Sequence, residues 1–210
     1  INLGGRIAFD QKGNIFLSTG DNNQRIRAQH LNQLQGKILR LTPEGGVPQD
    51  NPFVNDQRAK PEIWTYGNRN AQGLAINPWS GALWETEHGP RGGDEVNLPK
   101  AGKNYGWPLA TFGINYSGQP IPEAKGTTLA GAEDPIYYWK VSPALSGMAF
   151  YHAQTFPQWK NSLFVGALAG KSLIRLTLDG DKVTHEERLL SDRNERIREV
   201  QVGADGFVYV

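Results

Sequence analysis

Turn-forming residues alternate with short apolar runs along most of the chain, a pattern typical of β-strands joined by tight turns. Four segments share it, namely residues 10–21, 77–89, 157–170 and 203–210. Each opens on residues such as Gly, Pro, Asn or Asp and continues with alternating or continuous apolar residues. We therefore predict a strand in each of the four.

A second unit is repeated less closely. The strings GKILRLTPEGG from Gly36 and GKSLIRLTLDGD from Gly170 share a Gly-Lys pair, an Arg-Leu-Thr run and a glycine-containing turn. Spaced, imperfect self-similarity in an all-β chain favours the blades of a β-propeller. We predict one domain over residues 1–210, a partial propeller of about three to four blades. Because a closed propeller has about four to eight blades, we expect sequence to be missing at both ends.

Helical periodicity is weak. Residues 22–35 have apolar positions that fit either one short helix or an irregular loop. Two long connections, roughly 43–62 and 98–135, are rich in Gly, Pro and Asn. Loops of this length in a compact domain are usually functional or bind a partner.

Composition agrees with this fold and excludes several functions. The 210 residues include 25 Gly and 13 Pro, and 10% are aromatic. A net charge of +1 gives no global attraction to nucleic acid or to an acidic membrane. The chain has no Cys and no apolar run near the ~20 residues of a membrane span. No phosphate-binding loop, dinucleotide fingerprint or nucleophile elbow occurs in its required context.

The loop EHGPRGGDE, residues 87–95, has the groups that a hard cation prefers. The carbonyls of Gly89 and Pro90 and the carboxylates of Glu87, Asp94 and Glu95 could converge on calcium. A tight turn with a solvated charge cluster is an equal alternative. His88, inside this loop, could be a pH-tuned group. The other histidines, which have no metal-ligand spacing, are predicted to be surface or packing residues: His30, His152 and His185.

Two arginine motifs could bind an anion. Arg69 beside Asn70 offers a guanidinium fork and an amide that suit a carboxylate or a quinone oxygen, although a surface ion pair is the simpler role. Arg196 and Arg198 would face the same side of a strand, where like charges favour an anion between them. The alternative is a solvated edge strand with ion pairs to neighbouring carboxylates: Asp192, Glu195 and Glu199.

Lysine follows glycine in both copies of the repeat, as Lys37 and Lys171, so a structural role is at least as probable for it as an anion contact. The aromatic residues of NYGWPLATFGINYSG, residues 104–118, could line a ligand or simply fill a loop. Taken singly, these signals do not identify a site.

Longer strings carry a specific resemblance. GGRIAFD, AQHLNQLQGKILRLTPEG, EIWTYGNRNAQGLAINPWSGALW, EHGPRGGDEVN, GKNYGWPLATFGINYSG and ERIREV, with DNPF, SGMAFY and LFVGAL, follow one another in a family order over nearly all 210 residues. The chain resembles the soluble pyrroloquinoline-quinone-dependent aldose sugar dehydrogenases of the glucose/sorbosone dehydrogenase family.

The resemblance implies a six-bladed propeller of four-stranded antiparallel blades, with the quinone over one mouth and a calcium ion holding it. It also implies cofactor contacts and metal ligands. The cofactor-binding positions would be Arg69, Asn70, Tyr116, Ala167, Leu168, Ala169, Arg196, Ile197 and Arg198. The calcium-binding positions would be Gly89, Pro90, Glu95 and Tyr105, with one ion or two.

Two positions depart from the family pattern. Family members often have a lysine at the position of Ala169, and the nearest lysine here is Lys171. The family's general base, a histidine three residues before the Gly of the Gly-Arg pair, corresponds to Asn2, whose amide cannot accept that proton at neutral pH.

Three functions therefore compete. The first is a dehydrogenase that oxidises aldoses to lactones by hydride transfer to the quinone and passes electrons to an external acceptor. The second is a propeller that binds quinone or sugar without turnover, and the third is a calcium-dependent lactonase. The family also implies a periplasmic or secreted protein that is a monomer or homodimer.

Overall fold

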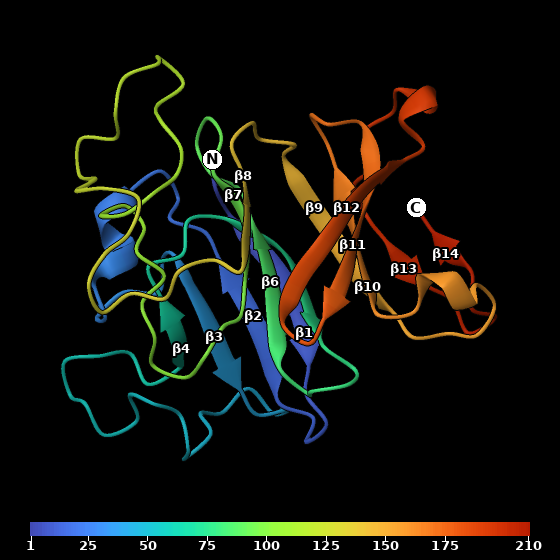
Figure 1. The fold of residues 1–210 in the computed structure, drawn as a ribbon. Helices are drawn as coiled ribbons and strands as arrows, with labels where there is room; N and C mark the ends of the chain where they lie inside the picture. The colour runs from blue at the N-terminus through green and yellow to red at the C-terminus, as the bar shows by residue number, and fades with distance from the viewer.

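The computed structural model describes residues 1–210, and its regular structure is almost entirely β-strand (Figure 1). Three four-stranded antiparallel sheets follow one another along the chain, each in simple sequential order, and a two-stranded sheet follows them. The first sheet contains β1 (Gly4–Phe9), β2 (Ile15–Thr19), β3 (Lys37–Leu41) and β4 (Ile63–Tyr66). The second contains β5 (Ala71–Ile76), β6 (Leu83–Glu87), β7 (Asp94–Asn97) and β8 (Tyr137–Trp139).

The third sheet and the two-stranded sheet complete the set. The third contains β9 (Leu145–Tyr151), β10 (Ser162–Ala167), β11 (Ser172–Asp179) and β12 (Lys182–Leu189). The last contains β13 (Gln201–Val202) and β14 (Val208–Tyr209). Three short 3-10 helices lie in loops: η1 (Arg25–Gln29), η2 (Pro157–Trp159) and η3 (Ser191–Arg193).

The first strands of successive sheets lie side by side. β1 packs beside β5, β5 beside β9, and β9 beside β13. Sheets that meet through their first strands and fan outward are the blades of a β-propeller. The predicted fold class, an all-β propeller of four-stranded antiparallel blades, is confirmed.

The predicted strands occupy equivalent places. The four turn-and-strand segments contain β2, β6, β10 and β14, each the second strand of its sheet. The two copies of the Gly-Lys repeat form β3 and β11, both third strands. Residues 22–35 contain only the short helix η1, so the irregular-loop alternative comes closer to the structure.

The apolar core lies between the blades. Ala8, Phe16 and Ile38 of the first sheet pack against Ala71 and other residues of the second. A larger cluster joins the second and third sheets. A single antiparallel sheet cannot bury both faces, so stacking neighbouring blades supplies the core. The members of the larger cluster are Trp84, Val96, Trp139, Leu145, Met148, Phe150, Leu163, Val165, Ala167, Ile174, Leu176 and Leu178.

One end of the blades gathers the loops that matter for function, and we call it the mouth. Because neighbouring strands run in opposite directions, six connections leave at this end, which faces upward in Figure 1: residues 20–36, 67–70, 88–93, 140–144, 168–171 and 190–200. The long connection 98–136 leaves from the opposite end and climbs to the mouth, where Ile114 forms a β-bridge with Arg91.

Candidate functional site

Two adjoining cavities open at the mouth and share Pro90 and Tyr116. The first has a volume of about 350 Å³ and the second of about 720 Å³. Ile1, Asn2, Asp21, Asn23, Arg25, Arg69, Pro90, Trp107, Asn115 and Tyr116 line the first. The second is lined by His88, Gly89, Pro90, Arg91, Gly92, Ile114, Tyr116, Gly118, Lys140, Val141, Ser142, Ala144 and Ala169. Residues from at least five separate loops thus meet at one place.

Arg69 is the buried cation of the first cavity. One of its terminal nitrogens donates to the carbonyl oxygens of His88 at 2.9 Å and Gly89 at 2.7 Å. The guanidinium carbon lies 5.2 Å from the ring centre of Trp107, a cation–π contact. Its Nε is buried and has no hydrogen-bond partner in the protein. A surface ion pair, the simpler role expected from the sequence, is therefore wrong for Arg69, and its Nε is left as an orphaned donor.

Most of the hydrogen-bonding groups of Asn70, unlike those of Arg69, are already used within the protein. Its side-chain oxygen accepts hydrogen bonds from the Gly4 amide at 3.1 Å and from Gln72 at 3.0 Å. Its backbone amide donates to Glu87 at 3.2 Å. Only the NH₂ group of its side chain makes no hydrogen bond inside the protein, and this group is what Asn70 can offer a ligand.

Asn2 lies in the first cavity beside an acid. Its amide nitrogen donates to Oδ1 of Asp21 at 2.8 Å, and the indole of Trp107 donates to Oδ2 at 2.8 Å. The Asn23 backbone amide also donates to Oδ1, at 2.9 Å. Sequence reasoning missed Asp21, because no motif indicates a partner so distant along the chain as Trp107. Trp107 itself is one of the aromatic residues of 104–118 that could line a ligand, and it lines the first cavity.

Asp94, which is fully buried, ties the loop 88–93 to the first residue of β9. One carboxylate oxygen accepts the Gly89 amide at 3.0 Å and the other accepts the Leu145 amide at 3.2 Å. Gly89 is packed so tightly that an added Cβ would lie 2.2 Å from the Gly92 carbonyl oxygen. His88 contacts the Leu145 carbonyl through Nε2, and burial lowers the pKa of its imidazole. The alternative of a solvated charge cluster is therefore wrong.

Three carboxylates lie together behind this loop. Glu85 and Glu87 point to the same side of β6, and Glu95 on β7 is the direct cross-strand partner of Glu87. None of them forms an ion pair, while Asn68 donates to both oxygens of Glu85 at 3.1 and 3.0 Å. Burial raises the pKa of Glu85 to about 7 and, with the Glu87 charge, that of Glu95 to about 8. Burial also raises the pKa of Glu87 well above its ordinary value.

Such a cluster is expensive unless protons or a cation neutralise it. The side-chain oxygen of Asn97, the cross-strand partner of Glu85, is buried without a partner. Carboxylate and amide oxygens are the ligands that calcium prefers. Glu85 was missed from the sequence, although Glu85 and Glu87 alternate within a strand that is otherwise buried, a signal that could have indicated it.

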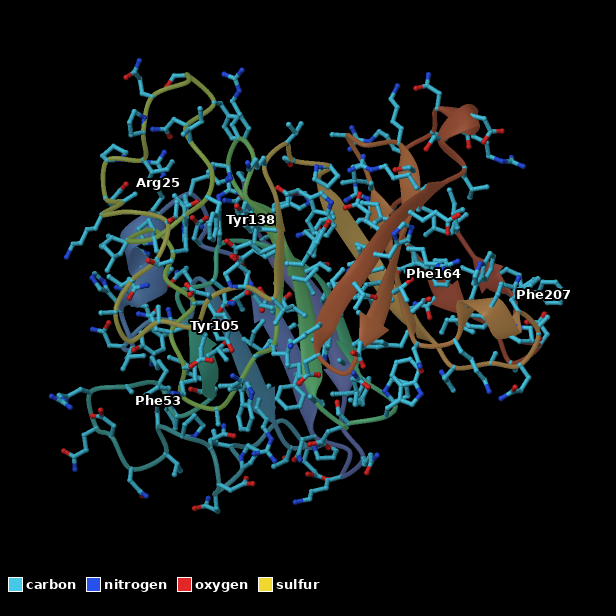
Figure 2. All side chains as sticks on the ribbon, in the orientation of Figure 1. Arg25, Phe53, Tyr105, Tyr138, Phe164 and Phe207 are labelled. Carbon is cyan, nitrogen blue, oxygen red and sulfur yellow. The ribbon has the colours of Figure 1, made fainter.

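Tyr105 lies deeper than the mouth loops, between the levels of Arg25 and Phe53 in Figure 2. Its ring is buried. Its hydroxyl accepts a hydrogen bond from the Lys100 backbone amide at 2.9 Å and donates one to the Leu98 carbonyl. Burial raises the pKa of its phenol, to which the charge of Glu85 also contributes. The predicted metal positions thus form two groups, with the Gly89–Pro90 carbonyls at the mouth and Glu95 and Tyr105 beside the buried carboxylates.

Arg196 and Arg198 flank the buried Ile197 in a segment that belongs to no strand, so the predicted edge strand is wrong at this point. The side chains still alternate, with both arginines exposed and Ile197 buried. Neither guanidinium forms an ion pair, which contradicts the alternative of pairing with Asp192, Glu195 or Glu199. The three residues line a third cavity of about 650 Å³. Two unpaired cations here are free to meet an anion.

The segment 167–169 follows β10 at the mouth. Ala167 and Leu168 are buried, and only Ala169 is exposed, in the wall of the second cavity. Lys171 turns away and donates to the side-chain oxygen of Asn194 at 3.0 Å. Lys37, its counterpart in the repeat, is fully buried and donates to the carbonyls of Arg27, Ala28 and Gln35. The lysine that lines the second cavity with Ala169 is Lys140.

The remaining predictions concern exposed side chains. Tyr116 is 73% exposed and lies at the junction of both mouth cavities. His30, His152 and His185 are exposed, as predicted for surface residues. No helix of the structure is long and apolar enough to cross a membrane.

Comparison with known proteins agrees with the geometry. The sequence profile of the family described as Glucose / Sorbosone dehydrogenase matches residues 1–210. The aldose sugar dehydrogenase YliI of Escherichia coli is 60% identical over 208 residues, 99% of this chain and 56% of that protein. The apo-form crystal structure of the soluble aldose sugar dehydrogenase from Escherichia coli superposes with a TM-score of 0.97 at 60% identity, covering 99% of this chain and 60% of that one.

A more distant relative has been solved in a PQQ-bound form. The PQQ-bound form of aldose sugar dehydrogenase from Streptomyces coelicolor is 33% identical, with a TM-score of 0.77 over 95% of this chain and 52% of that one. The present chain therefore spans somewhat more than half the length of these relatives.

Proposed function

Because the chain belongs to the glucose/sorbosone dehydrogenase family, we propose that it forms the cofactor-binding part of a quinoprotein that oxidises aldose sugars at the anomeric carbon to lactones. The observation that supports this most strongly is the set of unpaired guanidinium groups. The Nε of Arg69 is buried without a partner, and Arg196 and Arg198 have no ion pair. In a protein of net charge +1, such groups suit a small polyanion.

Pyrroloquinoline quinone fits this set because it carries three carboxylates beside an ortho-quinone, and when bound it supplies the acceptor for a hydride. Arg69 would bind through the nitrogens that have no partner in the protein, while one terminal nitrogen holds the loop 88–93. Asn70 would donate through its NH₂ group, and Tyr116 would offer its exposed ring. Arg196 and Arg198 would bind from the other side, with Ile197 and the segment Ala167, Leu168 and Ala169 forming the wall between. Lys140, which lines the second cavity with Ala169, would supply the cation that the family has at Ala169, whereas Lys171 donates to Asn194.

Calcium would be held by the groups that the fold leaves with excess negative charge. Glu95 lies among carboxylates without an ion pair, and Tyr105 adjoins them. The Gly89 carbonyl accepts only one donor, Arg69, so its second lone pair is free. With Pro90, it would form the calcium position at the mouth.

The proton acceptor is the weak point of the dehydrogenase hypothesis. Oxidation of a hydroxylated carbon requires a base, and the amide of Asn2 cannot serve as one at neutral pH. Asn2 instead donates a hydrogen bond from its side-chain nitrogen to Asp21 at 2.8 Å. This contact favours, as a second candidate function, a propeller that binds quinone or sugar without turnover.

Reconstitution with quinone, calcium and an aldose, followed by reduction of an artificial electron acceptor, tests the proposal. Quinone-dependent reduction supports the dehydrogenase. Quinone binding without reduction supports the second candidate and rejects the first. Hydrolysis of lactones with calcium alone, without quinone binding, would indicate the lactonase. An aldose as substrate, an external electron acceptor, a periplasmic or secreted location and a monomeric or homodimeric state follow from the family resemblance alone.

A further inference from the structure

Arg6, on β1, reaches three neighbouring parts of the propeller with one side chain. Its Nε donates to the carbonyl oxygen of Gln72 on β5 at 2.5 Å. One terminal nitrogen pairs with the carboxylate of Glu199, and the other donates to the carbonyl oxygen of Arg198 at 3.3 Å. Arg198 and Glu199 lie just before β13, separated from it only by Val200. A single guanidinium thus joins the first strands of the first and second blades to the segment that enters the fourth.

Gly147 on β9 makes this reach possible. A Cβ at this position would lie 2.3 Å from a carboxylate oxygen of Glu199 and 3.1 Å from a terminal nitrogen of Arg6, so any larger residue would displace the pair. The amide of Gly147 also donates to the Arg198 carbonyl, at 3.0 Å. The Arg198 carbonyl therefore accepts from two strands at once, and its peptide plane is held from both.

The segment 196–198 needs such support. It belongs to no strand, and apart from these contacts it is tied by the Ile197 amide to the Ala167 carbonyl at 3.2 Å and by the Ser146 hydroxyl to the Ile197 carbonyl at 2.6 Å. The two unpaired guanidinium groups repel each other when no anion is present. Fixed peptides on both sides of Arg198 limit how far the arginines can separate.

The contacts of Arg6 contribute more to geometry than to stability. The side chains of Arg6 and Glu199 are 26% and 43% exposed, and ion pairs with that much access to water contribute about 1 kcal/mol or less. The pair of Arg175 with Glu187, between β11 and β12, has nearly the same exposures, 16% and 41%, at 3.0 Å. It touches none of the mouth loops and is therefore a matched control.

We propose that Arg6 is a positioning residue for Arg196 and Arg198, the two arginines that would bind an anion. By fixing the Arg198 peptide against β1, β5 and β9, it sets the directions in which Arg196 and Arg198 present their guanidinium groups. This inference rests on the proposed function, in which these two arginines bind the quinone carboxylates. It assigns no contact between Arg6 and the cofactor.

The first test needs no cofactor. Amide hydrogen exchange of Ile197 and Gly147 is compared in the wild type, Arg6→Met and Arg175→Met without quinone. We expect Arg6→Met to lower protection of these two amides about threefold to fivefold, the effect of losing a partly exposed charged donor. Arg175→Met should leave them unchanged. Equal protection in wild type and Arg6→Met would overturn the inference whether or not the protein binds quinone.

The second test measures quinone affinity by quenching of tryptophan fluorescence, well below the unfolding temperature of every variant. Arg6→Met and Gly147→Ala should each weaken binding about tenfold, and Arg175→Met should bind as the wild type does. Wild-type binding with an unchanged Arg6→Met affinity would overturn the positioning role while the proposed function stands. Absence of wild-type binding would instead reject the proposed function, and the exchange result would then decide whether Arg6 positions the segment.

Discussion

Replacing Glu95 with Gln should change the stability of the metal-free protein in a direction that depends on pH. Burial and the neighbouring Glu87 charge raise the pKa of Glu95 to about 8 from 4.5. Between these two pH values the folded state keeps a proton that the unfolded state releases, so stability falls as pH rises through this window. At about 1.4 kcal/mol per pKa unit, the carboxyl destabilises the metal-free fold at pH 8 by on the order of 4 kcal/mol relative to pH 4.

The amide of Glu95→Gln has nearly the same shape and no charge. In the presence of a chelator, we therefore expect the variant to be more stable than the wild type at pH 8, by up to that amount, and about equal at pH 4. Calcium should reverse the order at pH 8, because the wild type gains a ligand that the variant lacks. Urea unfolding at the two pH values, with chelator and with calcium, measures all four conditions.

Glu44→Gln is the matched control, since Glu44 is exposed and has no ion pair. It should change the free energy of unfolding little under any of these conditions. If Glu95→Gln destabilised the metal-free protein equally at both pH values, the side chain would be acting through shape and hydrogen bonding. The electrostatic reasoning about the three buried carboxylates would then be wrong.

Two further substitutions test the remaining parts of the site and its support. Lys37→Met should destabilise the protein by about 2 kcal/mol, because the Gln35 carbonyl loses its only donor. Lys171→Met, at the exposed counterpart in the repeat, should change the free energy of unfolding almost not at all. Equal losses in urea unfolding would contradict the difference between the two environments. Asn2→His should raise the rate of quinone-dependent acceptor reduction by about 10²-fold or more, since an imidazole at this position would lie beside Asp21. A rate no higher than that of the wild type would show that the missing base does not limit turnover.

The blade pattern was accessible from the sequence because it depends on local chemistry. Turn formers before β2, β6, β10 and β14, and the repeated Gly-Lys strands β3 and β11, indicate strands without any knowledge of their neighbours. β12 was missed because it is an outer strand with many exposed polar residues, so it lacks the apolar run that marks the inner strands. The segment 194–200 was read as a strand because its side chains alternate, but its ladder begins only at Gln201.

The site was less accessible, because its residues act through partners distant in the chain. Arg69 could be recognised as a candidate cation, whereas its orphaned Nε and its stacking on Trp107 depend on the path of the connection 98–136. The repeat suggested one role for Lys37 and Lys171. The loop around η1 surrounds only the first of them with carbonyls. Asp21 and Arg6 carry no local signal, since their partners lie 86 and 193 residues away.

Binding of pyrroloquinoline quinone is the central claim and can be measured directly. Quinone is titrated into the protein with calcium while the fluorescence of the tryptophans, Trp107 among them, is recorded. The same titration is made on Arg69→Ala and on Arg58→Ala, an exposed arginine paired only with Asp56. We predict saturable binding by the wild type and by Arg58→Ala, and a clear loss of affinity in Arg69→Ala. No saturable quenching in the wild type, or equal affinity in all three proteins, would contradict the account.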